Sequence, residues 1–227
     1  MQTLSRQREQ ASARMRCVRI TEVFCSLQGE ARTVGLPTVF VRLTGCPLRC
    51  QYCDTAYAFH GGEWRDFDDI RHQVRSYGVR HVTVTGGEPL AQKPCVQLLR
   101  ELCDDGYEVS LETSGALDIS AVDPRVSRVL DLKTPGSGEC ARNLWSNIEH
   151  LTPHDQVKFV LCDREDYEWA CAVMREHNLA DRCEVLFSPS YTQLPPATLA
   201  DWIVADALPV RYQLQLHKIL WGDEPGR

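Results

Sequence analysis

The sequence predicts an α/β fold in which helices cover a parallel β-sheet. From residue 16 onward, short apolar and β-branched runs alternate with helix-like stretches at intervals that suit repeated βα units. The strand candidates are strongly apolar, which is typical of strands that are covered on both faces. These observations leave open whether the sheet stays open or closes into a full or partial barrel.

Each expected element is assigned from its own residue pattern. The strand candidates are short runs rich in apolar and β-branched residues, at 18–24, 38–43 (TVFVRL), 79–84 (VRHVTV), 107–112 (YEVSLE), 127–132, 155–161 (DQVKFVL), 183–187 and 211–216. The helix candidates lie between them, near 67–77, 92–105, 142–150, 164–177 and 197–205. No internal repeat or low-complexity linker divides the sequence, so we expect a single domain over 16–227. The polar residues 1–15 lack an apolar face and are expected to form a flexible N-terminal extension.

Charge and composition limit the partners that the protein is expected to bind. The 227 residues contain 25 Lys and Arg against 31 Asp and Glu, a net charge of -6, and no basic stripe stands out. We therefore expect a small-molecule substrate, with no nucleic acid and no membrane partner. The eleven cysteines are odd in number, in a chain that is not small and shows no signal peptide, which favours a reducing cytoplasm.

Residues 46–53, CPLRCQYC, place Cys46, Cys50 and Cys53 in a CxxxCxxC spacing. Three thiolates on one tight loop can hold three corners of a cubane 4Fe-4S cluster and leave the fourth iron open to another ligand. The alternative is a zinc site completed by His60 or by another cysteine. Structural zinc sites usually combine two CxxC-like pairs, and the sequence has no second pair, so the spacing favours the cluster.

Other polar motifs directly follow later strand candidates. TGGEP (85–89), ETSG (112–115) and LDLKT (130–134) each come where such a strand ends, as the cysteine loop does. In parallel α/β folds, the chemistry gathers on loops at the carboxyl ends of the strands. We therefore expect one edge of the sheet to bring together Cys46, Cys50, Cys53, Thr85, Gly87, Glu112, Asp131 and Lys133.

The cysteine loop after one strand and GGEP after a later one resemble the radical S-adenosylmethionine (SAM) enzymes. The resemblance implies a partial, incomplete βα barrel in which SAM binds the open iron, and reductive cleavage of SAM yields a 5′-deoxyadenosyl radical. The residues of the GGEP segment suit such a cofactor site. Gly86 and Gly87 would let the backbone approach the cofactor closely, while Glu88 and the rigid Pro89 would shape the turn.

Within that superfamily the chain resembles the 7-carboxy-7-deazaguanine synthase family. The match is carried by FCSLQGEA (24–31), FVRLTGCPLRCQYCDT (40–55), VTGGEPL (84–90), LETSG (111–115) and QLHK (215–218). The resemblance implies a lyase of queuosine and 7-deazapurine biosynthesis. It would convert 6-carboxy-5,6,7,8-tetrahydropterin to 7-carboxy-7-deazaguanine with loss of ammonia. Mg²⁺ as a further cofactor, a homodimer and a flavodoxin-type reductant are implied as well.

The resemblance also assigns site residues, position by position. The implied metal ligands are Cys46, Cys50 and Cys53 for the cluster and Thr55 for Mg²⁺. The implied substrate residues are Leu27, Gln28, Gly29, Arg42 and Thr85, to which we add Glu30 as an acceptor for the pterin edge and His217 as a candidate. The implied SAM contacts are Tyr52, Cys53, Asp54, Gly87, Asp131, Leu132, Lys133, Ser188, Pro189, Ser190 and Tyr191.

Several of these residues have an alternative role. Thr55 could cap the next turn, Arg42 could form a surface ion pair, and Asp131 could pair with Lys133 or cap a turn. His217 could be structural.

For the whole protein, one alternative is an enzyme that activates a glycyl-radical enzyme, which would leave LQGE and QLHK unexplained. The other is a non-enzymatic module whose cysteines bind zinc or transfer electrons.

Overall fold

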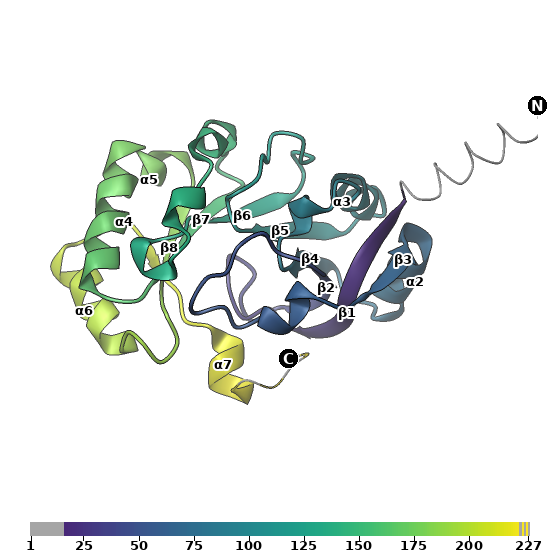
Figure 1. The fold of residues 1–227 in the computed structure, drawn as a ribbon, viewed down its shortest axis with the longest axis horizontal. Helices are drawn as coiled ribbons and strands as arrows, with labels where there is room; N and C mark the ends of the chain where they lie inside the picture. Colours follow the sequence, from purple (N-terminus) through teal and green to yellow (C-terminus); the bar gives the residue numbers. More distant parts are fainter. Residues whose placement is uncertain (1–15, 223, 225, 227) are drawn as a thin grey trace, which may run out of the picture.

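The protein folds around one nine-stranded sheet, with helices along its periphery (Figure 1). The structure, a computed structural model, describes residues 16–222, 224 and 226, and the extension expected at 1–15 lies outside them. Within the described residues the strand order is β3-β1-β2-β4-β5-β6-β7-β8-β9. The strands are β1 (Cys17–Leu27), β2 (Pro37–Leu43), β3 (Glu63–Asp66), β4 (His81–Gly86), β5 (Glu108–Thr113), β6 (Ser127–Asp131), β7 (Gln156–Leu161), β8 (Glu184–Pro189) and β9 (Arg211–Tyr212).

Strand direction divides the sheet into a parallel part and an antiparallel edge. Every neighbouring pair from β2 to β9 runs parallel. β1 runs antiparallel to both β2 and β3. Because β3 and β9 lie at the two ends of the strand order, the sheet stays open. The expected α/β fold with an incomplete βα barrel is therefore confirmed.

Helices and short turns connect the strands. The α-helices are α2 (Phe67–Ser76), α3 (Cys95–Asp104), α4 (Arg164–Glu176), α5 (Leu179–Arg182), α6 (Pro196–Ala205) and α7 (Leu216–Trp221). The 3₁₀ turns cover Ala56–Phe59, Pro89–Ala91, Pro135–Ser137, Cys140–Arg142 and Trp145–His150. None of the helices in the described part of the chain is long and apolar enough to cross a membrane.

Two of the covering helices begin at aspartate caps that the sequence supplies. Asp66 accepts a hydrogen bond from the Asp69 amide at 2.9 Å, and Asp163 accepts one from the Asp166 amide at 3.0 Å. Such caps satisfy amide groups that the first helical turn leaves free. The caps therefore fix where α2 and α4 begin.

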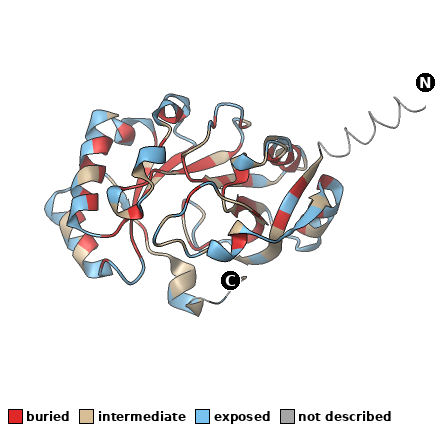
Figure 2. Ribbon diagram, viewed as in Figure 1, coloured by how far each residue is buried: buried red, intermediate tan, exposed pale blue. Residues whose placement is uncertain are grey.

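The core lies between the strands and the inward faces of the helices (Figure 2). In α2 the buried residues are Phe67, Ile70 and Val74, a spacing that places them on one helical face. Helix α3 repeats this with Cys95, Leu98, Leu99 and Leu102. Burial of these apolar faces holds the helices against the sheet. The packed sheet in turn holds the loops at the strand ends in place.

Some local expectations were wrong. The expected helix at 142–150 consists of 3₁₀ turns, because the buried Asn147 side chain bonds the Ile119 amide and the Leu117 carbonyl instead of pointing to solvent. The expected strand at 211–216 ends at Tyr212, and α7 begins at Leu216. Cysteines are usually buried, and of the eight outside the cysteine loop only Cys25 is exposed.

Candidate active site

A cavity of ≈ 590 Å³ is lined by residues of the strands and of the loops at their ends. Its size suits small-molecule ligands, which usually occupy a few hundred to about 1,000 Å³. The cysteine loop after β2, the GGEP turn after β4, and the ends of β5 and β6 all contribute to its wall. The C-terminal segment 215–218 lines it as well. The expectation that motif residues gather at one edge is met by this cavity.

The LQGE segment reaches the cavity by a different route from the other motifs. Because β1 runs antiparallel to β2, Leu27 lies beside Pro37 at the beginning of β2. The chain then crosses to the far strands, where the Ala31 amide donates to Gln213 at 2.8 Å and the Arg32 amide donates to Gln156 at 2.9 Å. This crossing brings Glu30 next to β7 and the C-terminal segment.

The cysteine loop rests directly on the GGEP turn. The Glu88 amide donates to the Gly45 carbonyl at 2.8 Å. A Cβ on Gly87 would lie 2.1 Å from the Gly45 oxygen and 2.9 Å from the Cys46 Cβ, so only glycine allows this approach. The turn and the loop therefore form one surface at the mouth of the cavity.

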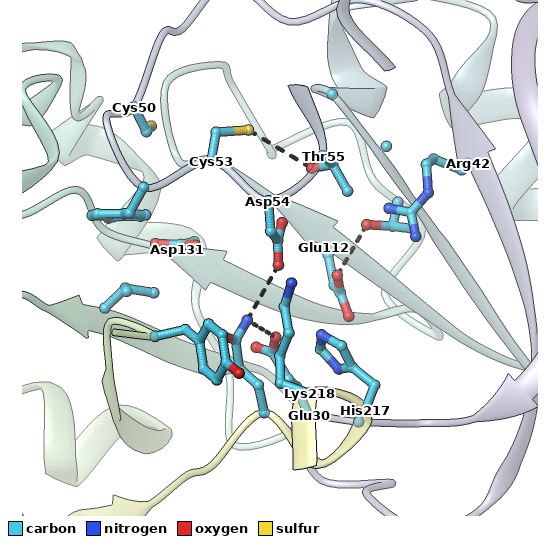
Figure 3. Close-up of a pocket in the computed structure, with 18 of the residues that line it drawn as sticks. Glu30, Arg42, Cys50, Cys53, Asp54, Thr55, Glu112, Asp131, His217 and Lys218 are labelled. Atoms are coloured by element: carbon cyan, nitrogen blue, oxygen red, sulfur yellow. Dashed lines mark hydrogen bonds between the residues drawn. The ribbon is translucent and has the colours of Figure 1, made fainter. Parts of the chain in front are cut away.

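The three cysteines fit a cubane cluster. Cys46, Cys50 and Cys53 all line the cavity, and Figure 3 shows Cys50 and Cys53 on the loop above it. Among the described residues, no three His, Cys, Asp or Glu side chains form a group that could hold a metal ion. In a cubane each cysteine binds a different iron, so the thiols need not converge on one point. Burial raises the pKa of Cys50 to about 11, so iron binding there must displace a proton.

A buried charge network lies beside the cysteines. The Lys158 ammonium is 2.8 Å from Glu30 and 3.5 Å from Asp131, and Lys133 is 3.1 Å from Asp131. Burial would raise the pKa of Glu30, but Lys158 outweighs it and lowers that pKa to about 2. Burial would lower the pKa of Lys158, yet Glu30, Asp131 and Glu112 keep it well above its usual value. Glu30 and Lys158 are therefore both charged near neutral pH.

Two buried polar atoms in this region are left without a protein partner. Within the described chain, neither the Tyr52 hydroxyl nor Asp131 Oδ1 has a hydrogen-bond partner. Both residues line the cavity. Because an unmade hydrogen bond at a buried group costs about 1–3 kcal/mol, atoms of this kind indicate a ligand that completes them.

A second group of polar residues comes from β2, β4 and β5. Thr85 donates to Glu112 at 2.9 Å, and burial raises the pKa of Glu112. Arg42 forms an ion pair with Glu22 at 2.6 Å and lies 5.7 Å from the centre of the Phe24 ring. The Arg42 side chain lines the cavity and is only 13% exposed, so it does not form an ion pair on the open surface.

Most of the residues predicted from the sequence line this one cavity. They are Leu27, Gln28, Gly29, Glu30, Arg42, Cys46, Cys50, Tyr52, Cys53, Asp54, Thr55, Thr85, Gly87, Asp131, Lys133, Ser190, Tyr191 and His217. Three predicted SAM contacts do not line it: Leu132, Ser188 and Pro189 are buried in or beside the strands. Asp131 pairs with Lys133 through Oδ2, which was the alternative role considered for it. Within the described chain, Asp131 Oδ1 has no hydrogen-bond partner.

Several residues that line the cavity were not predicted from the sequence, chief among them Lys158 and Gln215. Gln215 donates to Glu30 at 3.0 Å and to Asp54 at 3.3 Å. Lys158 lies opposite Asp131 in the parallel pairing of β6 and β7. A lysine inside an otherwise apolar strand was the available signal, because such strands rarely bury a charge that has no partner.

An open βα barrel with a CxxxCxxC loop after its first parallel strand defines a radical SAM enzyme. In agreement, the model of the Radical SAM superfamily matches residues 40–133. A 7-carboxy-7-deazaguanine synthase of Chlorobaculum tepidum is 42% identical over 90% of this chain and 94% of its own length. One from Koribacter versatilis is 40% identical over 91% of this chain and 98% of its own length. The chain belongs to the 7-carboxy-7-deazaguanine synthase family.

The solved structures agree with the fold. The crystal structure of QueE from Escherichia coli matches with a TM-score of 0.72, covering 88% of this chain and 95% of that chain. At 23% sequence identity this likeness bears on the fold alone. Family membership therefore rests on the sequence relatives, and the architecture rests on the structure.

Proposed function

We propose that this protein converts 6-carboxy-5,6,7,8-tetrahydropterin to 7-carboxy-7-deazaguanine with loss of ammonia, as a radical SAM lyase of queuosine and 7-deazapurine biosynthesis. The observation that carries the proposal is that one cavity joins the three cysteines to Glu30, Arg42 and Thr85. Family membership supports the same reaction. The product is the substrate less one ammonia, so the reaction needs no net oxidant.

We assign one part of the cavity to the cofactors. Cys46, Cys50 and Cys53 would hold the 4Fe-4S cluster, with SAM between the GGEP turn and Asp131. When bound, cluster and SAM supply a 5′-deoxyadenosyl radical that removes a hydrogen from C6 of the pterin. The Tyr52 hydroxyl and Asp131 Oδ1 are buried acceptor or donor atoms ready for a ligand on this side.

We assign the rest of the cavity to the substrate. The Glu30 carboxylate is suited to accept hydrogen bonds from the 2-amino and N3 positions of the pterin. The guanidinium of Arg42 is suited to the substrate carboxylate, with which it can form a bidentate pair. Thr85 donates to Glu112 at 2.9 Å, and burial raises the pKa of Glu112. Together these groups would orient C6 toward the cofactor side.

Thr55 is proposed as the protein ligand of Mg²⁺. Its side chain makes no capping hydrogen bond to the 3₁₀ turn that follows it, although its carbonyl accepts from Ala58 at 2.9 Å. Its hydroxyl lies 3.8 Å from the Cys53 sulfur and lines the cavity. A hydroxyl is a hard oxygen ligand that Mg²⁺ accepts when substrate and water fill its other positions.

Thr55→Ala is expected to lower turnover by about tenfold or more, since metal-site contacts usually contribute that much. The visible spectrum of the cluster should be unchanged, and the Mg²⁺ concentration needed for half-maximal rate should rise. Thr55→Ser, which keeps the hydroxyl, is the matched control and should stay near the parent. Loss of the cluster spectrum in Thr55→Ala would show that Thr55 acts structurally.

The proposal extends to three properties of the protein in the cell. We propose a homodimer that works in the cytoplasm and receives electrons from a flavodoxin-type protein. Family resemblance supports each of these. Sedimentation of the cluster-loaded protein tests the dimer, and reduction by purified flavodoxin in place of dithionite tests the electron donor.

A comparison of two pterins tests the substrate assignment. The reduced, cluster-loaded protein is given SAM and Mg²⁺ with either 6-carboxytetrahydropterin or 6-hydroxymethyltetrahydropterin. Because Arg42 is assigned to the carboxylate, only the first should be consumed. Equal consumption of both would contradict the assignment, and SAM cleavage without any change in either pterin would favour the activator of a glycyl-radical enzyme.

A further inference from the structure

We propose that Lys158 is a positioning residue that holds Glu30 and Asp131 together and so fixes the pterin substrate relative to SAM. The inference rests on the proposed function, which places the pterin edge at Glu30 and SAM at Asp131. Lys158 itself belongs to neither set of predicted ligands. It lies on β7, opposite Asp131 of β6, and its side chain is only 12% exposed.

The contacts of Lys158 orient both carboxylates. Glu30 Oε2 accepts from Lys158 at 2.8 Å, and its Oε1 accepts from Gln215 at 3.0 Å, so each oxygen has a fixed neighbour. Asp131 Oδ2 lies 3.1 Å from Lys133 and 3.5 Å from Lys158. This leaves Asp131 Oδ1, which has no partner in the described chain, as the oxygen available to a ligand.

The composition of the chain makes a lysine at this point unusual. Its 25 cationic residues are 21 arginines and only four lysines. Three of those four, Lys133, Lys158 and Lys218, line the cavity, whereas Lys93 is exposed. Arginine presents a planar fork, but an ammonium is a compact charge that can donate in several directions at once. That property suits a cation placed between carboxylates from two different segments.

The buried carboxylates around Lys158 favour a cation at this position. Glu30, Asp131 and Glu112 all lie close enough to Lys158 to act on its charge. Burial would lower the pKa of Lys158, and these three carboxylates together raise it instead. Without the ammonium, Glu30 and Asp131 would repel each other in a region that water screens poorly, and each would turn to another partner. The position of the pterin would then no longer be fixed relative to SAM.

Lys158→Met tests the proposal, with Lys93→Met as the matched control. Cluster-loaded protein is titrated anaerobically with SAM alone and with 6-carboxytetrahydropterin alone, and each dissociation constant is measured. Lys158→Met should weaken both ligands by about tenfold. The ratio of 5′-deoxyadenosine released to 7-carboxy-7-deazaguanine formed should rise, because SAM cleavage would no longer be aligned with the substrate. Lys93→Met should match the parent in all three measurements.

A double-mutant cycle with Glu30→Gln separates positioning from a general loss of structure. In the parent, Glu30→Gln frees Lys158 to move toward Asp131, so it should change SAM affinity even without pterin. In the Lys158→Met background the same Glu30→Gln change should leave SAM affinity unaltered. Additive effects would overturn the proposal, as would a Lys158→Met variant that binds both ligands like the parent. If Lys158→Met alone fails to fold, Lys158→Gln, which removes the charge but keeps a polar side chain, replaces it in the cycle.

The titrations also distinguish this proposal from the function on which it rests. A parent protein that binds SAM but not the pterin would contradict the proposed function, and the inference would fall with it. A parent protein that binds both, with Lys158→Met unchanged, would contradict the role of Lys158 alone.

Discussion

Cys50→Ala is expected to remove the 4Fe-4S cluster and all SAM cleavage. Cys50 lies on the cysteine loop, lines the cavity, and is one of three thiols assigned to the cluster. With two thiolates left, half of the cubane irons would have no protein ligand, and the cluster would not be held. Iron and sulfide content, visible absorbance and 5′-deoxyadenosine formation should all fall to background after anaerobic reconstitution.

Cys25→Ala is the control for that experiment. Cys25 is an exposed thiol outside the cysteine loop, so its loss should leave iron content and turnover at the parent level. The result also separates the cluster from the zinc alternative. A colourless parent protein that carries stoichiometric zinc, and loses it in Cys50→Ala, would contradict the cluster assignment.

Glu88→Ala is expected to cause the largest loss of stability among single changes near the site. The fully buried Glu88 carboxylate accepts from the Leu90 amide at 2.9 Å, from Thr113 at 3.0 Å, and from the Ser114 amide and hydroxyl at 2.7 and 2.5 Å. Its removal would leave several buried donors unsatisfied. We expect the free energy of unfolding to fall by about 3 kcal/mol.

The same change should weaken SAM binding, because Glu88 ties the GGEP turn to the loop after β5. Urea unfolding followed by circular dichroism measures the first effect, and anaerobic titration with SAM measures the second. Glu176→Ala, at an exposed position on α4, is the control and should change stability by no more than about 0.5 kcal/mol. A Glu88→Ala variant as stable as Glu176→Ala would contradict the role assigned to this carboxylate.

The parts of the fold that could be predicted are those with a local signal. Apolar β-branched runs such as TVFVRL predicted β2 and the other parallel strands, and the three cysteines predicted the loop that follows it. Their carboxyl-end loops meet at one cavity because parallel strands place those ends on one edge. Much of the cavity lining could therefore be predicted from the sequence.

The parts that could not be predicted depend on contacts between distant segments. The run RYQLQL alternates like a strand, but β9 ends at Tyr212, and the side chain of the next residue, Gln213, accepts from the Ala31 amide at 2.8 Å. Strand β3 is short, and its Trp64 is 69% exposed, so no apolar alternation marks it. The role of Lys158 depends on the register of β6 and β7, which places it opposite Asp131 and which one sequence does not reveal.

One reaction tests the central claim, that this cavity joins radical SAM chemistry to a pterin, most directly. The cluster-loaded, reduced protein is incubated anaerobically with SAM, Mg²⁺ and 6-carboxy-5,6,7,8-tetrahydropterin, and the products are identified by mass spectrometry. We expect a product lighter than the substrate by one ammonia that co-elutes with authentic 7-carboxy-7-deazaguanine and is absent without SAM. SAM cleavage with the pterin left intact would contradict the claim.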